Sequence, residues 1–195
     1  MRKLFLLFPF ILALAGPVRP ADPMPENQRW IEAIDGGFIF PVSSAAGRDY
    51  DRGVGGDILI GYRFDRSFSL SADLGYYDCD QKGTGASAGE WIYVPMLAVA
   101  RWTFGDGWVR PYALAGAGVA VNNYNLTQGV WGHVSNRETN LLLAPGAGAL
   151  FIIAPGTALY LQARLDLNFT TPGGPWTDNP SLFMPVKGGL SLFVL

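Results

Sequence analysis

Cysteine, histidine and charge are scarce in this sequence, and each scarcity excludes a class of protein. The 195 residues include one cysteine, Cys79, and one histidine, His133, so neither an intramolecular disulfide nor a closed zinc site can form. Charged residues make up 15% and hydrophobic residues 49%, which is too apolar for disorder and too poor in charge for an ordinary soluble surface. No basic stripe is present, so we expect no nucleic-acid partner; we also expect no cofactor.

The strongest positive signal is a strict alternation of apolar and polar residues. In the segment 157–169 every second residue is apolar, and Gln162, Arg164 and Asp166 lie between them. The segment 67–78 alternates in the same way. A period of two residues is typical of β-strands that separate two unlike faces. The pattern therefore predicts an all-β protein.

The first residues have the pattern of an export signal. Arg2 and Lys3 precede an apolar run at 4–12, and an A-x-A cleavage site follows at Ala13–Ala15. A run of about a dozen apolar residues is too short for a membrane helix, which needs roughly 20. We therefore expect export and cleavage after Ala15, with Ala21 as the alternative point. Export allows the protein to reach a lipid membrane. If the apolar face of the predicted strands points outward, lipid must cover it.

The chain is predicted to consist of three consecutive segments. We predict a signal peptide at 1–15, an extended leader at 16–29 and a single barrel domain at 30–195. The predicted strands are 30–42, 53–64, 67–78, 90–104, 109–122, 139–153, 157–169 and 182–195. Each strand is long enough for the 9–11 residues or so that a tilted strand needs to cross the hydrocarbon.

The connections between these strands alternate in length. Turns containing Asp, Gly or Pro lie at 64–67, 105–108 and 154–157, and longer connections lie near 43–52, 79–89, 123–138 and 170–181. The alternation predicts an eight-stranded antiparallel up-and-down transmembrane β-barrel with short periplasmic turns and longer extracellular loops. The sequence is compatible with two alternatives. Leu141–Leu161 is free of charge and could be a membrane helix, although Pro145 and Pro155 interrupt it; a soluble lipocalin-like barrel would invert the two faces.

The alternation also predicts which polar side chains face inward. An eight-stranded barrel has room inside for side chains and little else, so these residues are expected to form an ion-pair and hydrogen-bond network that fills the lumen. The residues are Glu32, Asp57, Arg63, Asp73, Arg101, Arg110, Gln162, Arg164, Asp166, Asn168 and Lys187. In the first strand, Glu32 and Asp35 cannot both face inward at a period of two unless a bulge at Gly36-Gly37 restores the phase.

Aromatic residues lie near the predicted strand ends. Their positions predict two girdles at the membrane–water boundaries, since aromatic rings tolerate apolar and wet surroundings together. The girdle residues are Trp30, Tyr76, Tyr77, Trp91, Tyr93, Trp102, Phe104, Trp108, Phe169 and Trp176.

Three strand sequences resemble those of small OmpA-like outer-membrane barrels. They are Arg110–Val119 after a Gly-Trp turn, Ala163–Phe169 near the end, and the closing Val186–Leu195. The resemblance implies a porin-like, non-enzymatic barrel of the Gram-negative cell envelope, located in the outer membrane. We expect a monomer that serves envelope structure and surface interaction. Its expected partners are outer-membrane lipid and lipopolysaccharide, the barrel-assembly machinery during insertion, and a surface ligand bound through the loops.

Two other functions are compatible with parts of the sequence. One is a narrow OmpW-like conduit for small apolar molecules. The other is lipid A hydrolysis, because Gly132–Asn136 is similar to the His-x-Ser-Asn motif of barrel lipid A deacylases, in which His133 would be the base and Ser135 the nucleophile. That family carries its motif on the penultimate strand, where this chain has Arg164 and Asp166. We therefore expect no enzymatic activity.

Overall fold

The structure of the protein is a computed structural model. It describes residues 29–42, 50–81, 90–127, 133–169 and 180–194. The predicted signal peptide and nearly all of the predicted leader lie outside these residues, as do Trp131 and Trp176.

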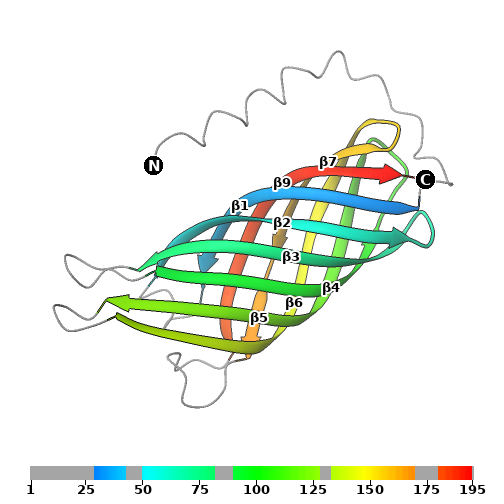
Figure 1. Cartoon of the computed structure of the whole chain (residues 1–195). Helices are drawn as coiled ribbons and strands as arrows, with labels where there is room; N and C mark the ends of the chain where they lie inside the picture. Colours follow the sequence, from blue (N-terminus) through cyan, green and yellow to red (C-terminus); the bar gives the residue numbers. More distant parts are fainter. Residues whose placement is uncertain (1–28, 43–49, 82–89, 128–132, 170–179, 195) are drawn as a thin grey trace.

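The described chain forms one antiparallel sheet that closes on itself (Figure 1). Neighbouring strands pair in chain order, and the last strand, β9, pairs with the first. The strands are β1 (Trp30–Pro41), β2 (Tyr50–Arg63), β3 (Phe68–Gln81), β4 (Glu90–Thr103), β5 (Val109–Thr127), β6 (His133–Ala154), β7 (Thr157–Arg164), β8 (Asp166–Phe169) and β9 (Ser181–Val194). Closure leaves no sheet edge, which a barrel in lipid requires.

Strands β7 and β8 occupy the place of one strand. Both pair with β6 on one side and with β9 on the other. The break falls at Leu165, whose N–H donates to the carbonyl of Pro145 at 2.8 Å. Proline has no N–H to return a bond to Leu165, so the ladder is interrupted at this pair. The barrel is thus eight-stranded, and the predicted fold class is confirmed.

Tight turns join the strands at one end of the barrel, where the C-terminus also lies (Figure 1). We call this the turn end and the opposite end the loop end. In the β2–β3 turn, Asp65 Oδ1 accepts hydrogen bonds from the backbone N–H groups of Ser67 at 2.7 Å and Phe68 at 2.8 Å. Gly105 and Gly156 have φ angles of 77° and 73°, in the left-handed region that glycine adopts without strain.

At the loop end, β5 and β6 extend furthest beyond the strands that the alternation predicts. β5 continues to Thr127 and β6 begins at His133, so most of the predicted loop at 123–138 is a paired hairpin extension. Apolar alternation stops here although the backbone ladder continues. A strand that leaves the lipid no longer needs an apolar face, and the hydrophobic pattern therefore underestimates its length.

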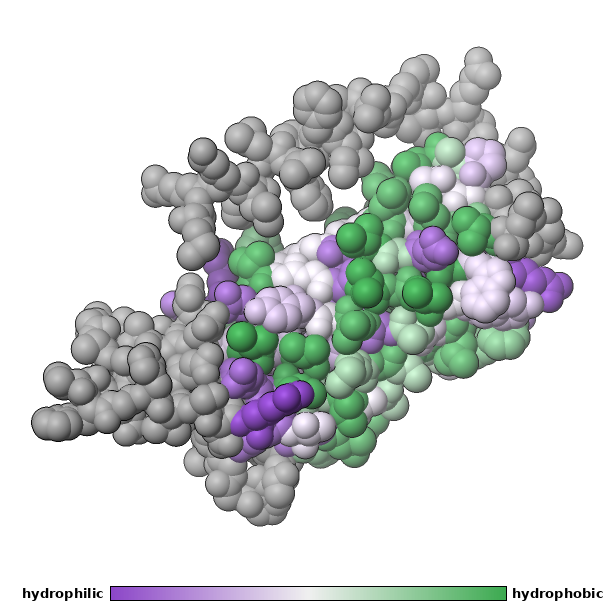
Figure 2. Space-filling view, viewed as in Figure 1, coloured by the Kyte–Doolittle hydropathy of each residue, from purple (hydrophilic) through white to green (hydrophobic). Residues whose placement is uncertain are grey.

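The outer face of the barrel is apolar. Ile34, Ile60 and Leu161 are 62%, 60% and 60% exposed, and hydrophobic side chains cover much of the surface in Figure 2. Arg164, a neighbour of Leu161 along β7, is only 1% exposed. This orientation contradicts the lipocalin-like alternative, which would place the apolar face inside. An exposed apolar band of this kind is what contact with lipid requires.

Leu141–Leu161 lies in β6 and β7, so the helical alternative for this segment is wrong. In the described residues no helix is both long enough and apolar enough to cross a membrane. The prolines and glycines of this segment break helical hydrogen bonds, whereas a barrel accepts them in strands and turns.

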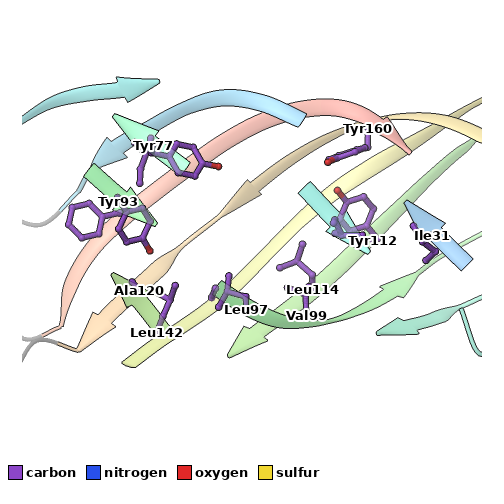
Figure 3. Packing of buried hydrophobic residues seen from close by; sticks show 14 of the residues in the cluster. Ile31, Tyr77, Tyr93, Leu97, Val99, Tyr112, Leu114, Ala120, Leu142 and Tyr160 are labelled. Atoms are coloured by element: carbon purple, nitrogen blue, oxygen red, sulfur yellow. The ribbon is translucent and has the colours of Figure 1, made fainter. Parts of the chain in front are cut away.

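The predicted aromatic girdles need one correction. Trp30, Trp102 and Trp108 are exposed on the outer face, but Tyr77 and Tyr93 are fully buried inside the barrel (Figure 3). Trp91 is also fully buried, and its ring lies 4.7 Å from that of Phe183 and 5.4 Å from that of Tyr93. These four inward rings, Tyr77, Trp91, Tyr93 and Phe183, form an aromatic cluster in the half of the lumen nearer the loop end.

Candidate functional site

The centre of the lumen holds Arg164 on β7 in contact with three carboxylates. Its Nε donates to Asp166 Oδ1 at 2.6 Å, and its Nη1 donates to Asp73 Oδ2 at 2.9 Å. Asp57 Oδ2 lies 3.7 Å from Nη1. The three aspartates come from β8, β3 and β2 respectively. A buried guanidinium is stable in such a place only when its charge and its donors are matched by partners of this kind.

Lys187 on β9 is the second cation of this centre. Its Nζ forms an ion pair with Asp35 Oδ2 at 3.0 Å and contacts Asp73 Oδ2 at 3.4 Å. It also donates to Asp57. Asp57 and Asp73 are therefore shared between Lys187 and Arg164. We call Asp35, Asp57, Asp73, Arg164, Asp166 and Lys187 the central cluster; it holds four carboxyl groups and two cations.

Tyrosine hydroxyls complete part of the central cluster. Tyr160 donates to Asp35 Oδ2 at 2.5 Å, and Tyr93 donates to Asp166 Oδ2 at 2.9 Å. Asp35 Oδ1 accepts a further bond from the backbone N–H of Asp57 at 2.8 Å. These neutral donors lower the cost of burying more acids than bases, because each donor takes the place of a lost water.

Three other predicted residues lie apart from the central cluster, toward the turn end. The guanidinium of Arg63 lies 5.5 Å from the ring centroid of Phe193, and that of Arg101 lies 4.7 Å from the ring of Tyr112. Arg110 donates from Nε to the carbonyl of Gly107 at 3.0 Å. The structure therefore divides the predicted inward residues into an acid-rich centre and a base-rich end.

The two predicted amides are also buried. Gln162 Oε1 accepts a hydrogen bond from the hydroxyl of Tyr112 at 3.1 Å. Asn168 is fully buried on β8, and neither atom of its amide has a hydrogen-bond partner among the described residues. Asn168 is thus inside the barrel but does not join the ion pairs.

The prediction for Glu32 is wrong, and Asp35 takes the inward position on β1. Glu32 is exposed on the outer face. Pairing of β1 with β9 continues without a shift from Trp30 to Pro41, so no bulge occurs at Gly36-Gly37. Both faces of β1 carry apolar residues, and hydrophobicity alone could not fix its phase.

The backbone of His133 and Ser135 lies in β6, not in a loop as predicted. His133 is paired with Thr127 and Ser135 with Asn125 of β5. Their side chains lie outside the described part of the structure. The penultimate strand position of the hydrolase motif holds Arg164 and Asp166, whose side chains are joined in an ion pair.

Comparison with known proteins gives the family. The model of the outer membrane protein beta-barrel domain matches residues 8–182. Among solved structures, Neisserial surface protein A aligns with a TM-score of 0.60 and 16% identity, over 87% of this chain and 99% of that one. No curated protein sequence matches the chain.

Two further barrels have the same fold. OprG from Pseudomonas aeruginosa aligns with a TM-score of 0.52 and 14% identity, over 88% of this chain and 99% of that one. Ail, the attachment invasion locus protein of Yersinia pestis, solved with a heparin analogue, aligns with a TM-score of 0.53 and 13% identity, over 85% and 97%. At these identities the likeness shows the fold alone. From its family match, the chain belongs to the outer membrane protein beta-barrel domain family.

Proposed function

We propose that this outer-membrane barrel is non-enzymatic, has a closed and ion-paired lumen, and serves envelope structure and surface interaction through its extracellular loops. The central cluster carries the proposal. It draws residues from six strands, β1, β2, β3, β7, β8 and β9, across the middle of the lumen. These ion pairs connect strands on opposite sides of the barrel and stabilise it. The same side chains occupy the path that a solute would need through the lumen.

The aromatic cluster supports the same proposal. Trp91 is fully buried, and its Nε1 donates to Asn122 Oδ1 at 3.1 Å. Tyr93 joins the two clusters, because its ring packs near that of Phe183 at 5.7 Å and its hydroxyl donates to Asp166. The lumen is therefore filled by an apolar layer that rests directly on a charged layer.

Conductance in planar lipid bilayers tests the closed lumen. The purified full chain is expected to insert without producing steady ion-conducting steps, because the central cluster and the aromatic cluster fill the lumen. The double variant Arg164→Ala with Trp91→Ala, which removes one side chain from each cluster, is the positive control and is expected to conduct. Steady conductance by the unaltered protein at neutral pH would contradict the proposal.

The absence of enzymatic activity is tested on lipid A. The motif of barrel deacylases lies on the penultimate strand, where this chain has Arg164 and Asp166 instead, which face the lumen and pair with each other. We expect no acyl chain to be lost when the protein is expressed in a host with defined lipid A and the lipid is analysed by mass spectrometry. Loss of a chain that His133→Ala prevents would make the protein an enzyme.

The partners that we propose follow from the outer surface. Exposed side chains such as Ile60 and Leu161 match acyl chains, and the exposed rings of Trp30 and Trp108 match the headgroup boundary. Outer-membrane lipid and lipopolysaccharide are thus the proposed contacts of a monomeric barrel, inserted by the barrel-assembly machinery. Chemical cross-linking in outer-membrane vesicles checks the monomer: an abundant cross-linked dimer would contradict it.

A narrow OmpW-like conduit for small apolar molecules is the second candidate. A hollow of about 400 Å³ lies on the outer face, lined by residues that include Ile34, Gly56, Ile58 and Leu74. Beside it, β1 and β2 are paired at Ile34–Ile58 and again at Gly37–Gly55, with no pair between. Uptake of a small apolar dye by cells whose lipopolysaccharide leaflet slows its entry, with and without the protein, decides between the candidates. Dye entry that Ile58→Trp blocks would favour the conduit.

A further inference from the structure

The hollow of about 400 Å³ lies on the lipid-facing surface of the barrel, over β1, β2 and β3. Its walls include the exposed side chains of Ile34, Ile58 and Leu74. The next outward positions of β1 and β2 toward the loop end are Gly36 and Gly56, which have no side chain. We call this indentation the outer hollow. It interrupts the apolar band, so the acyl chains of neighbouring lipids are what can fill it.

The size and chemistry of the outer hollow suit part of an acyl chain. An unfilled indentation is unfavourable, because the atoms that line it lose contacts. A water molecule occupies about 30 Å³ and a methylene group is of similar size, so the hollow has room for roughly a dozen methylene groups. Apolar walls offer water few partners, whereas an acyl chain packs against them.

The base of the outer hollow does not lead into the lumen. Asp35 and Asp57 lie at this base, and their carboxylates belong to the central cluster. Asp35 forms its ion pair with Lys187 at 3.0 Å and accepts the backbone N–H of Asp57 at 2.8 Å. This bond bridges β1 and β2 where their backbone pairing is interrupted. The hollow is therefore a closed indentation of the outer wall.

An exposed cation lies on the same outward face, nearer the loop end. Arg52 is four residues from Gly56 along β2. Its guanidinium lies 5.8 Å from the ring centroid of Phe38, the outward residue of β1 directly above the outer hollow. The neighbouring acids Asp51 and Asp78 take part in interactions of their own. Arg52 is thus held by an aromatic ring above the hollow, where its charge can meet an anion.

The distance between Arg52 and the outer hollow matches the dimensions of a lipid. A strand rises about 3.3 Å per residue and tilts by about 40° in a barrel, so four residues cover about 10 Å along the membrane normal. One leaflet contributes about 15 Å of hydrocarbon. A lipid whose headgroup lies at Arg52 therefore passes an acyl chain over the hollow before the chain reaches the midplane. Trp30, at the turn end, is six residues from Gly36, which places the hollow in the loop-end half of the band.

We propose that the outer hollow and Arg52 together bind one lipopolysaccharide molecule, with an acyl chain in the hollow and a phosphate of lipid A at Arg52. The inference deepens the proposed contact with lipopolysaccharide and rests on it, since extracellular loops place the loop-end half of the band in the outer leaflet. A guanidinium binds phosphate through paired N–H donors. The chain moves from lipid to protein, so close packing supplies the gain rather than removal from water.

Native mass spectrometry of the full chain, released from maltoside micelles, tests the proposal. The probe is synthetic lipid A of a single mass, and phosphatidylglycerol is the competing anionic lipid. We expect one lipid A molecule to bind saturably and phosphatidylglycerol to displace it poorly.

Filling the outer hollow with a ring tests the acyl-chain contact. Ile58→Trp should weaken lipid A binding roughly fivefold, because the indole occupies the space of the chain. Ile60→Trp is the matched control, since Ile60 is on the same face of β2 and 60% exposed but does not line the hollow; it should bind as the unaltered protein does. If Ile58→Trp does not fold, Leu74→Trp replaces it.

Removing the cation tests the headgroup contact. Arg52→Gln should weaken binding of lipid A up to roughly fivefold, as expected for an exposed ion pair. Arg137→Gln is the matched control, since Arg137 is an exposed arginine at the loop end of β6. It should leave the affinity unchanged.

The proposal is overturned if lipid A does not bind saturably, if phosphatidylglycerol binds equally well, or if Ile58→Trp and Ile60→Trp bind lipid A alike. Equal affinities of Arg52→Gln and Arg137→Gln would also overturn it. Failure of the closed-lumen proposal is seen separately, as steady conductance of the unaltered protein. Saturable lipid A binding that both Ile58→Trp and Arg52→Gln weaken would support the lipid site even then.

Discussion

Replacement of Arg164 by methionine should test the central cluster most directly. Methionine keeps much of the length of the side chain but removes the donors that reach Asp166 at 2.6 Å and Asp73 at 2.9 Å, and the charge 3.7 Å from Asp57. Removing one partner of a buried ion pair costs about 3–5 kcal/mol, because the other charge stays buried without compensation.

The contacts of each acid place Arg164→Met at the upper end of this range. Asp57 and Asp73 keep Lys187 as a partner, whereas Asp166 keeps the neutral hydroxyl of Tyr93. The double variant Arg164→Met with Asp166→Asn should therefore recover stability, because the uncompensated charge is removed while the acceptor for Tyr93 is retained. We expect the double variant to be more stable than the single one by roughly 2 kcal/mol.

Unfolding in urea from lipid vesicles, followed by tryptophan fluorescence, measures these differences. With a slope of about 2 kcal/mol per molar urea, a loss of 4 kcal/mol lowers the midpoint by about 2 M. Arg137→Met is the matched control, since Arg137 is exposed on β6, and its effect should stay within about 0.5 kcal/mol. A loss below about 1 kcal/mol for Arg164→Met, or equal losses for the single and double variants, would contradict the role of Arg164 as the partner of buried carboxylates.

Three further changes test other parts of the barrel. In a cysteine-free background, a cysteine at Leu161 should react with a lipid-phase reagent and one at Arg164 should not; reaction at both would refute the assigned faces. Trp91→Ala should destabilise the barrel by about 3–5 kcal/mol, since a fully buried ring is lost, and an unchanged urea midpoint would disprove the packing of the aromatic cluster. Gly75→Ala should cost about 1–3 kcal/mol, because a Cβ there would meet the carboxylate of Asp57; a neutral effect on unfolding would count against that contact.

In β7 and β8, the alternation of the sequence is enough to predict which side chains face the lumen. Leu161 faces outward, and Arg164 and Asp166 face inward, as the period of two predicts. In β1, the alternation does not predict which residues face the lumen. Both of its faces carry apolar residues, so the phase depends on its pairing with β2 and β9, and the structure places Asp35 inside and Glu32 outside.

The buried aromatic residues show a second limit. Tyr77, Trp91 and Tyr93 are close to the loop ends of their strands, where rings usually anchor a barrel in the membrane boundary. The inward phase of β3 and β4 directs these rings into the lumen instead. Strict use of the alternation would have found them, because Tyr77 has the same phase as Asp73, and Tyr93 the same phase as Arg101.

The alternation along the strands predicts the fold class and the face of most side chains, because successive side chains of a strand point to opposite sides. Which inward residues meet depends on how the strands are arranged in the closed barrel. Arg164 bonds to Asp73 across 91 residues of chain, while Arg101 lies near the turn end with Arg63. The height of each residue along the barrel axis depends on the stagger between strands. That stagger is set when the sheet closes between β1 and β9, and no local pattern records it.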